Sequence, residues 1–555
     1  MSRADLAFVN GAVYTVDAAR SRAQAIAVSD GRISMVGSDD EIRDAVGSET
    51  EVVDLAGRML LPGFQDAHCH PPSGGLDMIQ CDLNDFYTEP EYLKIVAEYA
   101  ERHPERPWIQ GGGWYMAAFP GGAPRHAALD AVVPDRPVLL FSRDGHSAWA
   151  NTRALEAAGI SAATPDPPDG RIERDPDGSP AGTLHDGAAN LVPAPDPTPE
   201  ELTEGLRLGQ EYLHSLGITA WQDAIVGGFY DTLPTYRRFA ETGDLTARVV
   251  GALWWDRHRG EEQIEELVEL RSTGQVGRFR PTSVKIMQDG IIEGFTAAMI
   301  EPYLDADGSP SDRSGPSFVE PAALNRAVTR LDSLGFQCHF HAIGDRAVRE
   351  SLDAIEAALA ANGANDHRHH IAHIQVIHPD DIPRFRRLRT VANGQPLWAC
   401  NDSQMEELTI PFLGEERTSW QYPFGSLVRS GATLAFGSDW SVSSPNALEE
   451  IHVAVNRRAV PNGLEESGES RRAFEEVFLP DERLDLETAI AAFTMGSAYV
   501  NHLDDVTGSI EVGKLADLTV LDRDLFAHPT DELALAKVDA TFVEGRRVFQ
   551  RDGTS

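Results

Sequence analysis

Short apolar strands alternate with helical segments through the middle of this 555-residue chain, and this alternation constrains its fold more than any other feature. The strand candidates include TSVKIMQ, FQCHFHAIG, HHIAHIQVI and TLAFGSD. Strands and helices in this order form parallel sheets whose strands are buried on both faces. The pattern predicts an α/β fold, specifically a (β/α)8 TIM-like barrel. Such a barrel has about 250 residues or more, and insertions together with a small companion domain would account for the rest of the chain.

The two ends of the chain have a different pattern. Residues 6–60, 507–522 and 540–550 contain short strands with Gly turns. We therefore expect residues 1–62 and 503–555 to share one sheet-rich domain beside a barrel of residues 63–502. Two segments rich in Pro, Asp and Gly, at 164–180 and 192–200, predict loops of an insertion at about 72–200, after the first barrel strand.

Charge and cysteine usage exclude several classes of function. The chain has 48 Lys and Arg against 87 Asp and Glu, a net charge of -39, which disfavours nucleic acids and anionic membrane surfaces as partners. No stretch of about 18 apolar residues and no secretory leader is evident. The four cysteines include no CxxC pair, which argues against a disulfide framework. We expect a cytoplasmic protein that acts on a small molecule.

The strongest local motif is LPGFQDAHCH, in which His68 and His70 lie two residues apart in a predicted strand. Alternation directs both imidazoles to one face and Cys69 to the other. Two such nitrogens at the carboxyl end of a barrel strand can chelate a zinc-like ion. A His-x-His pair alone is weak evidence, since surface or core histidines are common.

Further potential ligands follow at the ends of other predicted strands. His341 closes FQCHFHAIGD, His373 lies in HHIAHIQVI, and Asp439 follows LAFGSD. The carboxyl ends of all barrel strands meet at one mouth, so these side chains are expected to converge there. An Asp after a strand is more often a helix N-cap, and only its coincidence with the histidines favours a catalytic role.

Lys285 lies inside the apolar strand TSVKIMQDG, where an unpaired ammonium is costly. One interpretation is a lysine that reaches solvent or pairs with Asp289. The other is a lysine whose pKa is lowered by burial and which carbon dioxide carboxylates, so that it bridges two metal ions. Its position among the candidate ligands favours the second.

The chain resembles the YtcJ-like branch of the amidohydrolase superfamily, which includes N-substituted formamide deformylases. The resemblance covers nearly the whole chain. It rests on LPGFQDAHCH with the upstream IAVSDGRISMVG, and on VKIMQDG, HFHAIGDRAV, HIAHIQVIHPDDIPRF, FGSDW and GSIEVGKLADLTVLD. GGGWYMAAFPGG and PVLLFSRDGHSAWANTRAL also resemble the insertion of that branch.

The resemblance implies a site residue by residue, and it implies that the two termini form a small β-sandwich. His68 and His70 would bind one metal, carboxylated Lys285 would bridge, and His341 and His373 would bind a second metal. Asp439 would be a ligand and proton shuttle. The segment HIAH lacks the acidic residue often found before the ligand in that branch, and His373 is chosen over His369 and His370.

Weaker candidates surround this set. His146, in RDGHSAWAN, is expected to hydrogen-bond the substrate carbonyl or oxyanion, against the alternative of a structural histidine. His339 shares a face with His341 and is expected to support a ligand rather than be one. Trp114, Tyr115 and Trp440 are candidate pocket walls, although such aromatics are more often core.

These observations favour a metal-dependent hydrolase of a non-peptide C–N bond in a small amide. The cofactor would be one or two divalent ions, zinc first among them, and N-substituted formamides are the best single substrate class by resemblance. The alternatives are a metal-dependent decarboxylase or hydratase, and a binding protein without catalytic activity. A homodimer is compatible with the sequence.

Overall fold

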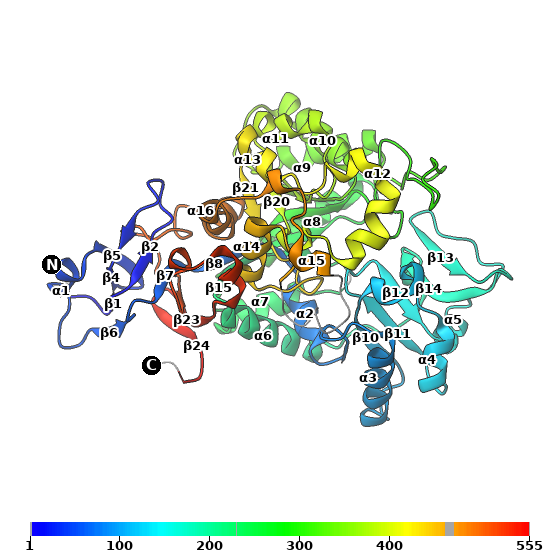
Figure 1. The fold of residues 1–555 in the computed structure, drawn as a ribbon, viewed down its shortest axis with the longest axis horizontal. Helices are drawn as coiled ribbons and strands as arrows, with labels where there is room; N and C mark the ends of the chain where they lie inside the picture. Colours follow the sequence, from blue (N-terminus) through cyan, green and yellow to red (C-terminus); the bar gives the residue numbers. More distant parts are fainter. Residues whose placement is uncertain (1–2, 229, 461–470, 554–555) are drawn as a thin grey trace.

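An eight-stranded, all-parallel sheet forms the centre of the molecule (Figure 1). The computed structural model describes residues 3–228, 230–460 and 471–553. The sheet has the strand order β21-β20-β19-β18-β17-β16-β15-β8. Its strands are β8 (Phe64–Cys69), β15 (Ile218–Val226), β16 (Arg248–Trp254), β17 (Phe279–Met287), β18 (Gln337–Ala342), β19 (His370–His373), β20 (Val391–Gly394) and β21 (Leu434–Phe436).

The first and last strands of this sheet meet and nearly close a barrel. The Asp439 amide donates to the His68 carbonyl (2.7 Å), and the His70 amide donates to the Trp440 carbonyl (2.6 Å). Gly437 permits this approach, because a Cβ atom there would lie 2.4 Å from the His68 backbone nitrogen. The predicted α/β fold with a parallel barrel is confirmed.

Helices follow the barrel strands along the chain and cover the sheet. The apolar faces of these helices and the outward side chains of the strands share one large hydrophobic core. The helices are α6 (Pro199–Ser215), α7 (Leu233–Thr242), α8 (Ile264–Gly274), α9 (Pro321–Ser333), α10 (Asp345–Asn362), α11 (Ile382–Leu388), α12 (Ile410–Thr418), α13 (Phe424–Ser430), α14 (Ala447–Asn456), α15 (Arg471–Glu475), α16 (Leu486–Ala491) and α17 (Ser497–Val500). Helix α6 begins with Pro199 after a capping box made by Thr198 and Glu201.

A six-stranded sheet lies between the first and second barrel strands in sequence and extends away from the barrel, in cyan in Figure 1. Its order is β13-β14-β12-β11-β10-β9. The elements of this region are α2 (Pro71–Asp77), β9 (Cys81–Asp82), α3 (Glu89–Arg102), β10 (Ile109–Trp114), α4 (His126–Val132), β11 (Val138–Ser142), β12 (Ser147–Ala150), α5 (Thr152–Ala157), β13 (Gly170–Arg174) and β14 (Pro180–Asp186). Trp114 and Trp149 belong to its own hydrophobic cluster.

The prediction that residues 164–180 contain only loops is wrong. The segment Gly170–Arg174 is strand β13, which pairs with β14 as an antiparallel edge. The turn residues Asp175–Gly178 connect the two strands, so the Pro, Asp and Gly content marks a hairpin turn as well as loops. The segment 192–200 is without regular structure until α6 starts.

Two sheets contain the strands of the chain ends. One has the order β5-β4-β1-β6, and the other, β24-β23-β22-β7-β2-β3, includes strands from both termini. Side chains of both sheets share one hydrophobic cluster, in which Phe8 and Phe542 lie edge to face with ring centroids 5.0 Å apart. The elements are β1 (Leu6–Val9), β2 (Ala12–Tyr14), β3 (Arg22–Ala23), β4 (Ala25–Ser29), β5 (Arg32–Gly37), α1 (Asp39–Arg43), β6 (Glu51–Asp54), β7 (Met59–Pro62), β22 (Leu518–Leu521), β23 (Val538–Val543) and β24 (Arg546–Gln550). The exact domain boundaries stay a prediction.

Two further features concern the whole described chain. Within residues 3–228, 230–460 and 471–553, no helix combines the length and the apolar character needed to cross a membrane. The side chains of all four cysteines are buried. They form no disulfide.

Candidate metal centre

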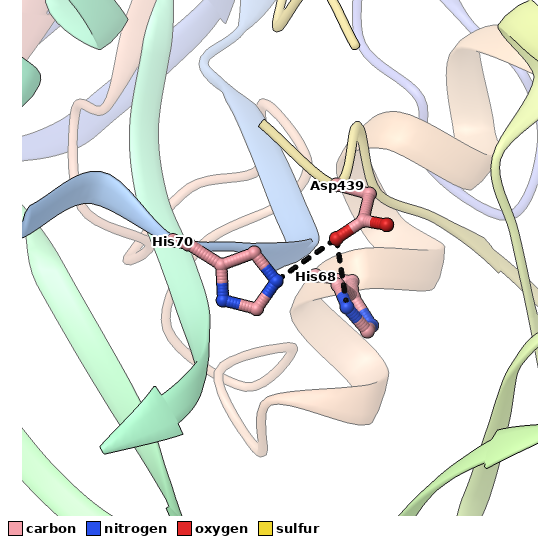
Figure 2. Close-up of side chains that lie close together, drawn as sticks. All are labelled: His68, His70 and Asp439. Atoms are coloured by element: carbon pink, nitrogen blue, oxygen red, sulfur yellow. Dashed lines mark hydrogen bonds and ion pairs between the residues drawn. The ribbon is translucent and has the colours of Figure 1, made fainter. Parts of the chain in front are cut away.

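The first and last barrel strands bring three potential ligands together at the mouth of the barrel. His68 and His70 come from the end of β8, and Asp439 comes from the turn after β21 (Figure 2). The Asp439 Oδ1 atom lies 3.1 Å from His68 Nε2 and 2.9 Å from His70 Nε2. One ligand atom of each residue lies within 4.8 Å of those of the other two, a spacing that suits a single metal ion.

The carboxyl group of Asp439 is ionised in this environment. Burial by itself raises its pKa, but the interactions of the carboxylate with His68 and the hydrogen bond from His70 lower the pKa well below its usual value. Asp439 is not a helix N-cap, because α14 begins at Ala447 with Asn446 as its cap. Its carboxylate is therefore available as a ligand or a base.

A second histidine orients His68. The Nδ1 atom of His68 lies 2.8 Å from His339 Nε2, which directs the other ring nitrogen of His68 toward Asp439. Burial and the charge of Lys285 lower the pKa of His68 to about 3, so its ring is neutral. A neutral imidazole fixed through its second nitrogen is the usual form of a metal ligand.

Lys285 lies directly beside the cluster. It is 1% exposed, and its Nζ atom is 3.4 Å from His68 Nε2. The interpretation that Lys285 reaches solvent or pairs with Asp289 is wrong, because the Asp289 carboxylate instead accepts backbone N–H groups of Ala298, Ile343 and Gly344. Burial lowers the pKa of Lys285 to about 7, which leaves much of the amine uncharged.

His373 and His341 lie on the same side of the barrel mouth. His373 Nδ1 is 3.9 Å from Asp439 Oδ2, and the rings of His341 and His373 have centroids 4.4 Å apart. His341 Nε2 is 3.3 Å from the Gly290 carbonyl oxygen. Both rings line the cavity above the cluster. Neither belongs to the compact group of His68, His70 and Asp439.

The other two histidines of the HHIAH segment are directed elsewhere. His370 packs against His339, with ring centroids 4.1 Å apart, and does not line the cavity. His369 accepts the Cys338 amide at Nδ1 (2.9 Å), so its Nε2 donates to Asp332 (2.9 Å). A metal at His369 Nε2 would require loss of that proton. The group of Asp332, His367 and His369 is therefore a hydrogen-bonded network rather than a second metal site.

His146 faces the cavity and is held by a carboxylate that the sequence did not reveal. Its Nδ1 lies 2.6 Å from Asp186 Oδ1, and its ring is 5.3 Å from that of His341. Burial by itself lowers the pKa of His146, but Asp186 outweighs it and the pKa is raised. Residues 146 and 186 are 40 apart, and their proximity follows from the antiparallel register of β12 and β14, in which Ser147 is opposite His185.

A cavity of about 610 Å³ opens above these residues. Tyr115 and Trp440 line it, as expected, and Trp398 stacks on His373 with ring centroids 5.5 Å apart. The expectation for Trp114 is wrong, because this ring is fully buried and its Nε1 donates to the Leu140 carbonyl (2.8 Å) in the inserted sheet. No pattern in the sequence indicated Trp398, which ends a short 3-10 helix after β20.

The residues at the mouth fit a divalent metal ion by their donor chemistry. Three imidazoles and a carboxylate suit zinc and related ions. The Nδ1 atom of His373 is buried without a hydrogen-bond partner, which is costly unless a ligand satisfies it. His68, His70 and Asp439 have the spacing to hold one ion, and Lys285 and His373 lie beside them.

Comparison with known proteins agrees with this geometry. The model of the Amidohydrolase family matches residues 51–549. The chain is 30% identical to the YtcJ protein of Bacillus subtilis, over 98% of both chains, and 28% identical to an N-substituted formamide deformylase of Arthrobacter pascens, over 99% of both. An uncharacterised metal-dependent hydrolase from Pyrococcus horikoshii has a similar structure (TM-score 0.72, 25% identity, 95% of this chain and 99% of that one). The resemblance expected from the sequence is confirmed.

Proposed function

Since this chain belongs to the amidohydrolase family, whose members are generally metal-dependent, we propose that it hydrolyses a non-peptide C–N bond of a small amide. The meeting of His68, His70 and Asp439 at the barrel mouth carries this proposal. Lys285, His341 and His373 around the same point support a site for one or two ions, with zinc as the first candidate. In a site with two ions, Lys285 would be carboxylated, because an ammonium would be repelled by two cations.

A divalent ion in this site would supply two effects, a lower pKa for water and a polarised substrate carbonyl. Asp439 is placed to accept the proton of the attacking water, because its carboxylate is ionised and faces the cavity. The same carboxyl group then donates the proton to the departing nitrogen, which must leave as an amine.

His146 is proposed to bind the carbonyl oxygen of the substrate. Asp186 accepts the Nδ1 proton of His146, and this fixes the ring so that Nε2 faces away from Asp186. A donor that is already oriented stabilises the negative charge that develops on the oxygen in the transition state. Asp186 would be a positioning residue.

N-substituted formamides are the proposed substrates. The similarity to the Arthrobacter deformylase over nearly the full length supports this choice. The test is incubation of the zinc-loaded protein with N-benzylformamide and measurement of formate and benzylamine by mass spectrometry, with chelator-treated protein as the control. Hydrolysis of another amide class without formamide turnover would retain the reaction and reject the substrate.

A decarboxylase or hydratase on the same barrel is the second enzymatic candidate, but no feature of the cavity favours it. The same product analysis separates it from hydrolysis. We also propose that residues 1–62 and 503–555 form a composite β-sandwich, and the hydrophobic cluster shared by their two sheets supports this.

A further inference from the structure

The cavity above the candidate metal centre is lined by many more acidic than basic side chains. Its described lining residues carry eight carboxyl groups and one guanidinium, whereas the whole chain has 87 acidic and 48 basic residues. The carboxyl groups are those of Asp77, Asp82, Asp85, Asp144, Glu293, Asp402, Asp439 and Glu449. Asp439 alone has a role in the proposed reaction. Burial raises the pKa of Asp77, Asp82, Glu293 and Glu449, and a bound cation would hold such groups in the charged form.

The guanidinium of Arg143 offsets only one part of this charge. It donates to the carbonyl oxygens of Asn84 and Phe86 and lies over the Tyr87 ring, 4.7 Å from its centroid. Its charge lowers the pKa of Asp82, although burial has the larger effect and the net shift is upward. The guanidinium also lies 5.6 Å from the centroid of the Tyr115 ring, so its positive charge lies on the side of the cavity formed by Asp82, Tyr87 and Tyr115.

Glu293 and Asp144 also line the cavity, and neither forms an ion pair with a described lysine or arginine. Glu293 Oε1 accepts the Thr409 hydroxyl (2.7 Å). Asp144 Oδ1 accepts the Ser142 hydroxyl (2.7 Å) and the His146 amide (2.8 Å). These donors are uncharged. Burial, and to a smaller extent the charge of Asp144, raise the pKa of Glu293, whereas hydrogen bonds, including those from Thr409 and Gln404, offset part of the rise.

Aromatic rings complete this part of the cavity. Tyr422 and Trp398, whose ring stacks on His373, line the cavity together with the two carboxylates. The faces of tyrosine and tryptophan rings attract cations and contribute most where water is excluded. Carboxylates beside aromatic faces suit an organic ammonium group, whereas a neutral or anionic ligand would bury these charges without compensation.

We propose that the substrate is a cationic amide, whose ammonium group lies against Glu293 and Asp144 while its C–N bond lies at His68, His70 and Asp439. This rests on the proposed function for the position of the amide. The recognition of the cation is an independent property of the cavity, and it is measurable without turnover.

The first experiment measures binding by calorimetry, with benzylammonium and its uncharged analogue benzyl alcohol as probes. A charge-assisted hydrogen bond corresponds to about tenfold or more in affinity, so wild-type protein should prefer benzylammonium by about this factor, and added salt should reduce the preference. Glu293→Gln and Asp144→Asn should each lose most of it. Glu415→Gln, which alters an exposed carboxylate on α12, should retain it. Equal affinities in the wild type, or a preference unchanged in both cavity variants, would overturn the proposal.

The second experiment separates this proposal from the proposed function. The zinc-loaded protein is given two formamides that differ only in a distal ammonium or hydroxyl group. A higher kcat/KM for the ammonium compound, lost in Glu293→Gln through KM, is the expected result. Equal turnover of both compounds would refute cation selection and leave the hydrolase intact. If neither compound is hydrolysed but the protein still prefers benzylammonium in the binding experiment, formamide hydrolysis is refuted and cation recognition is retained.

Discussion

Gly437 is the position where the addition of one methyl group should separate the two halves of the metal centre. Its ideal Cβ atom would lie 2.4 Å from the His68 nitrogen and 2.8 Å from the His68 Cβ atom, whereas ordinary contacts begin at 3.4 Å. Gly437→Ala therefore requires a displacement of about 1 Å between the end of β21 and β8. The expected loss of stability is about 1–3 kcal/mol, as for other overpacked sites.

The displacement should weaken the centre as well as the fold. Asp439 is hydrogen-bonded through its amide to the His68 carbonyl, so a shift of β21 moves the carboxylate away from both histidines. A misplacement of about 1 Å costs roughly a hundredfold in rate.

The assay combines denaturant unfolding of the metal-free protein with measurement of bound zinc. The matched control is Gly260→Ala, where the nearest atom is the flexible end of the exposed Glu262 side chain. Wild-type stability and full zinc content in Gly437→Ala would show that the close approach of the two strands does not matter.

The remaining predictions concern single groups. His68→Ala combined with His70→Ala should remove bound metal and activity but leave the far-ultraviolet circular dichroism unchanged, and full metal content in this variant would reject both ligands. Lys285→Ala should lose metal and activity, and added acetate or formate should restore part of both. No restoration by either carboxylate would argue against a carboxylated lysine. Asp186→Asn should lower kcat about tenfold or more with little change in metal content, and an unchanged kcat would remove its positioning role. His214 donates to the Ile218 carbonyl and faces the Thr246 hydroxyl, and burial lowers its pKa to about 4. Between pH 6.5 and about 4, His214 therefore binds a proton in the unfolded chain but not in the folded chain. The free energy of unfolding should fall by about 3 kcal/mol as pH falls through this window. Unfolding curves of His214→Gln should lack this loss.

The barrel and the identity of its ligand candidates were predictable because both depend on local periodicity. Alternation along LPGFQDAHCH and FQCHFHAIG determines which side chains share a face, and the carboxyl ends of parallel strands meet at one mouth. Strand β20 (Val391–Gly394) was not predicted, since four residues of mixed character carry little pattern. The short edge strand β13 was missed because its neighbouring turn residues dominate the composition.

Contacts that depend on the register between strands could not be predicted in the same way. His146 and Asp186 become neighbours only through the pairing of β12 with β14, and the pairing of His68 with His339 depends on the curvature of the barrel. The same limit applied to Trp114, whose burial in the inserted sheet depends on the packing of that sheet against its own helices.

The residues that the sequence predicts are those proposed to carry out the reaction, whereas the residues that it does not predict are those proposed to select the substrate. The metal-ligand candidates lie on barrel strands or directly after them, where the fold fixes their direction, as for His68 and Asp439. Asp144 comes from the insertion and Glu293 from the segment after β17, two parts of the chain whose meeting no sequence spacing specifies. We therefore expect changes in these two segments to alter the charge of the group that the cavity accepts while the metal-ligand candidates stay in place. This is why the proposed preference for a cation is best tested by changing Glu293 and Asp144, with the metal ligands left unchanged.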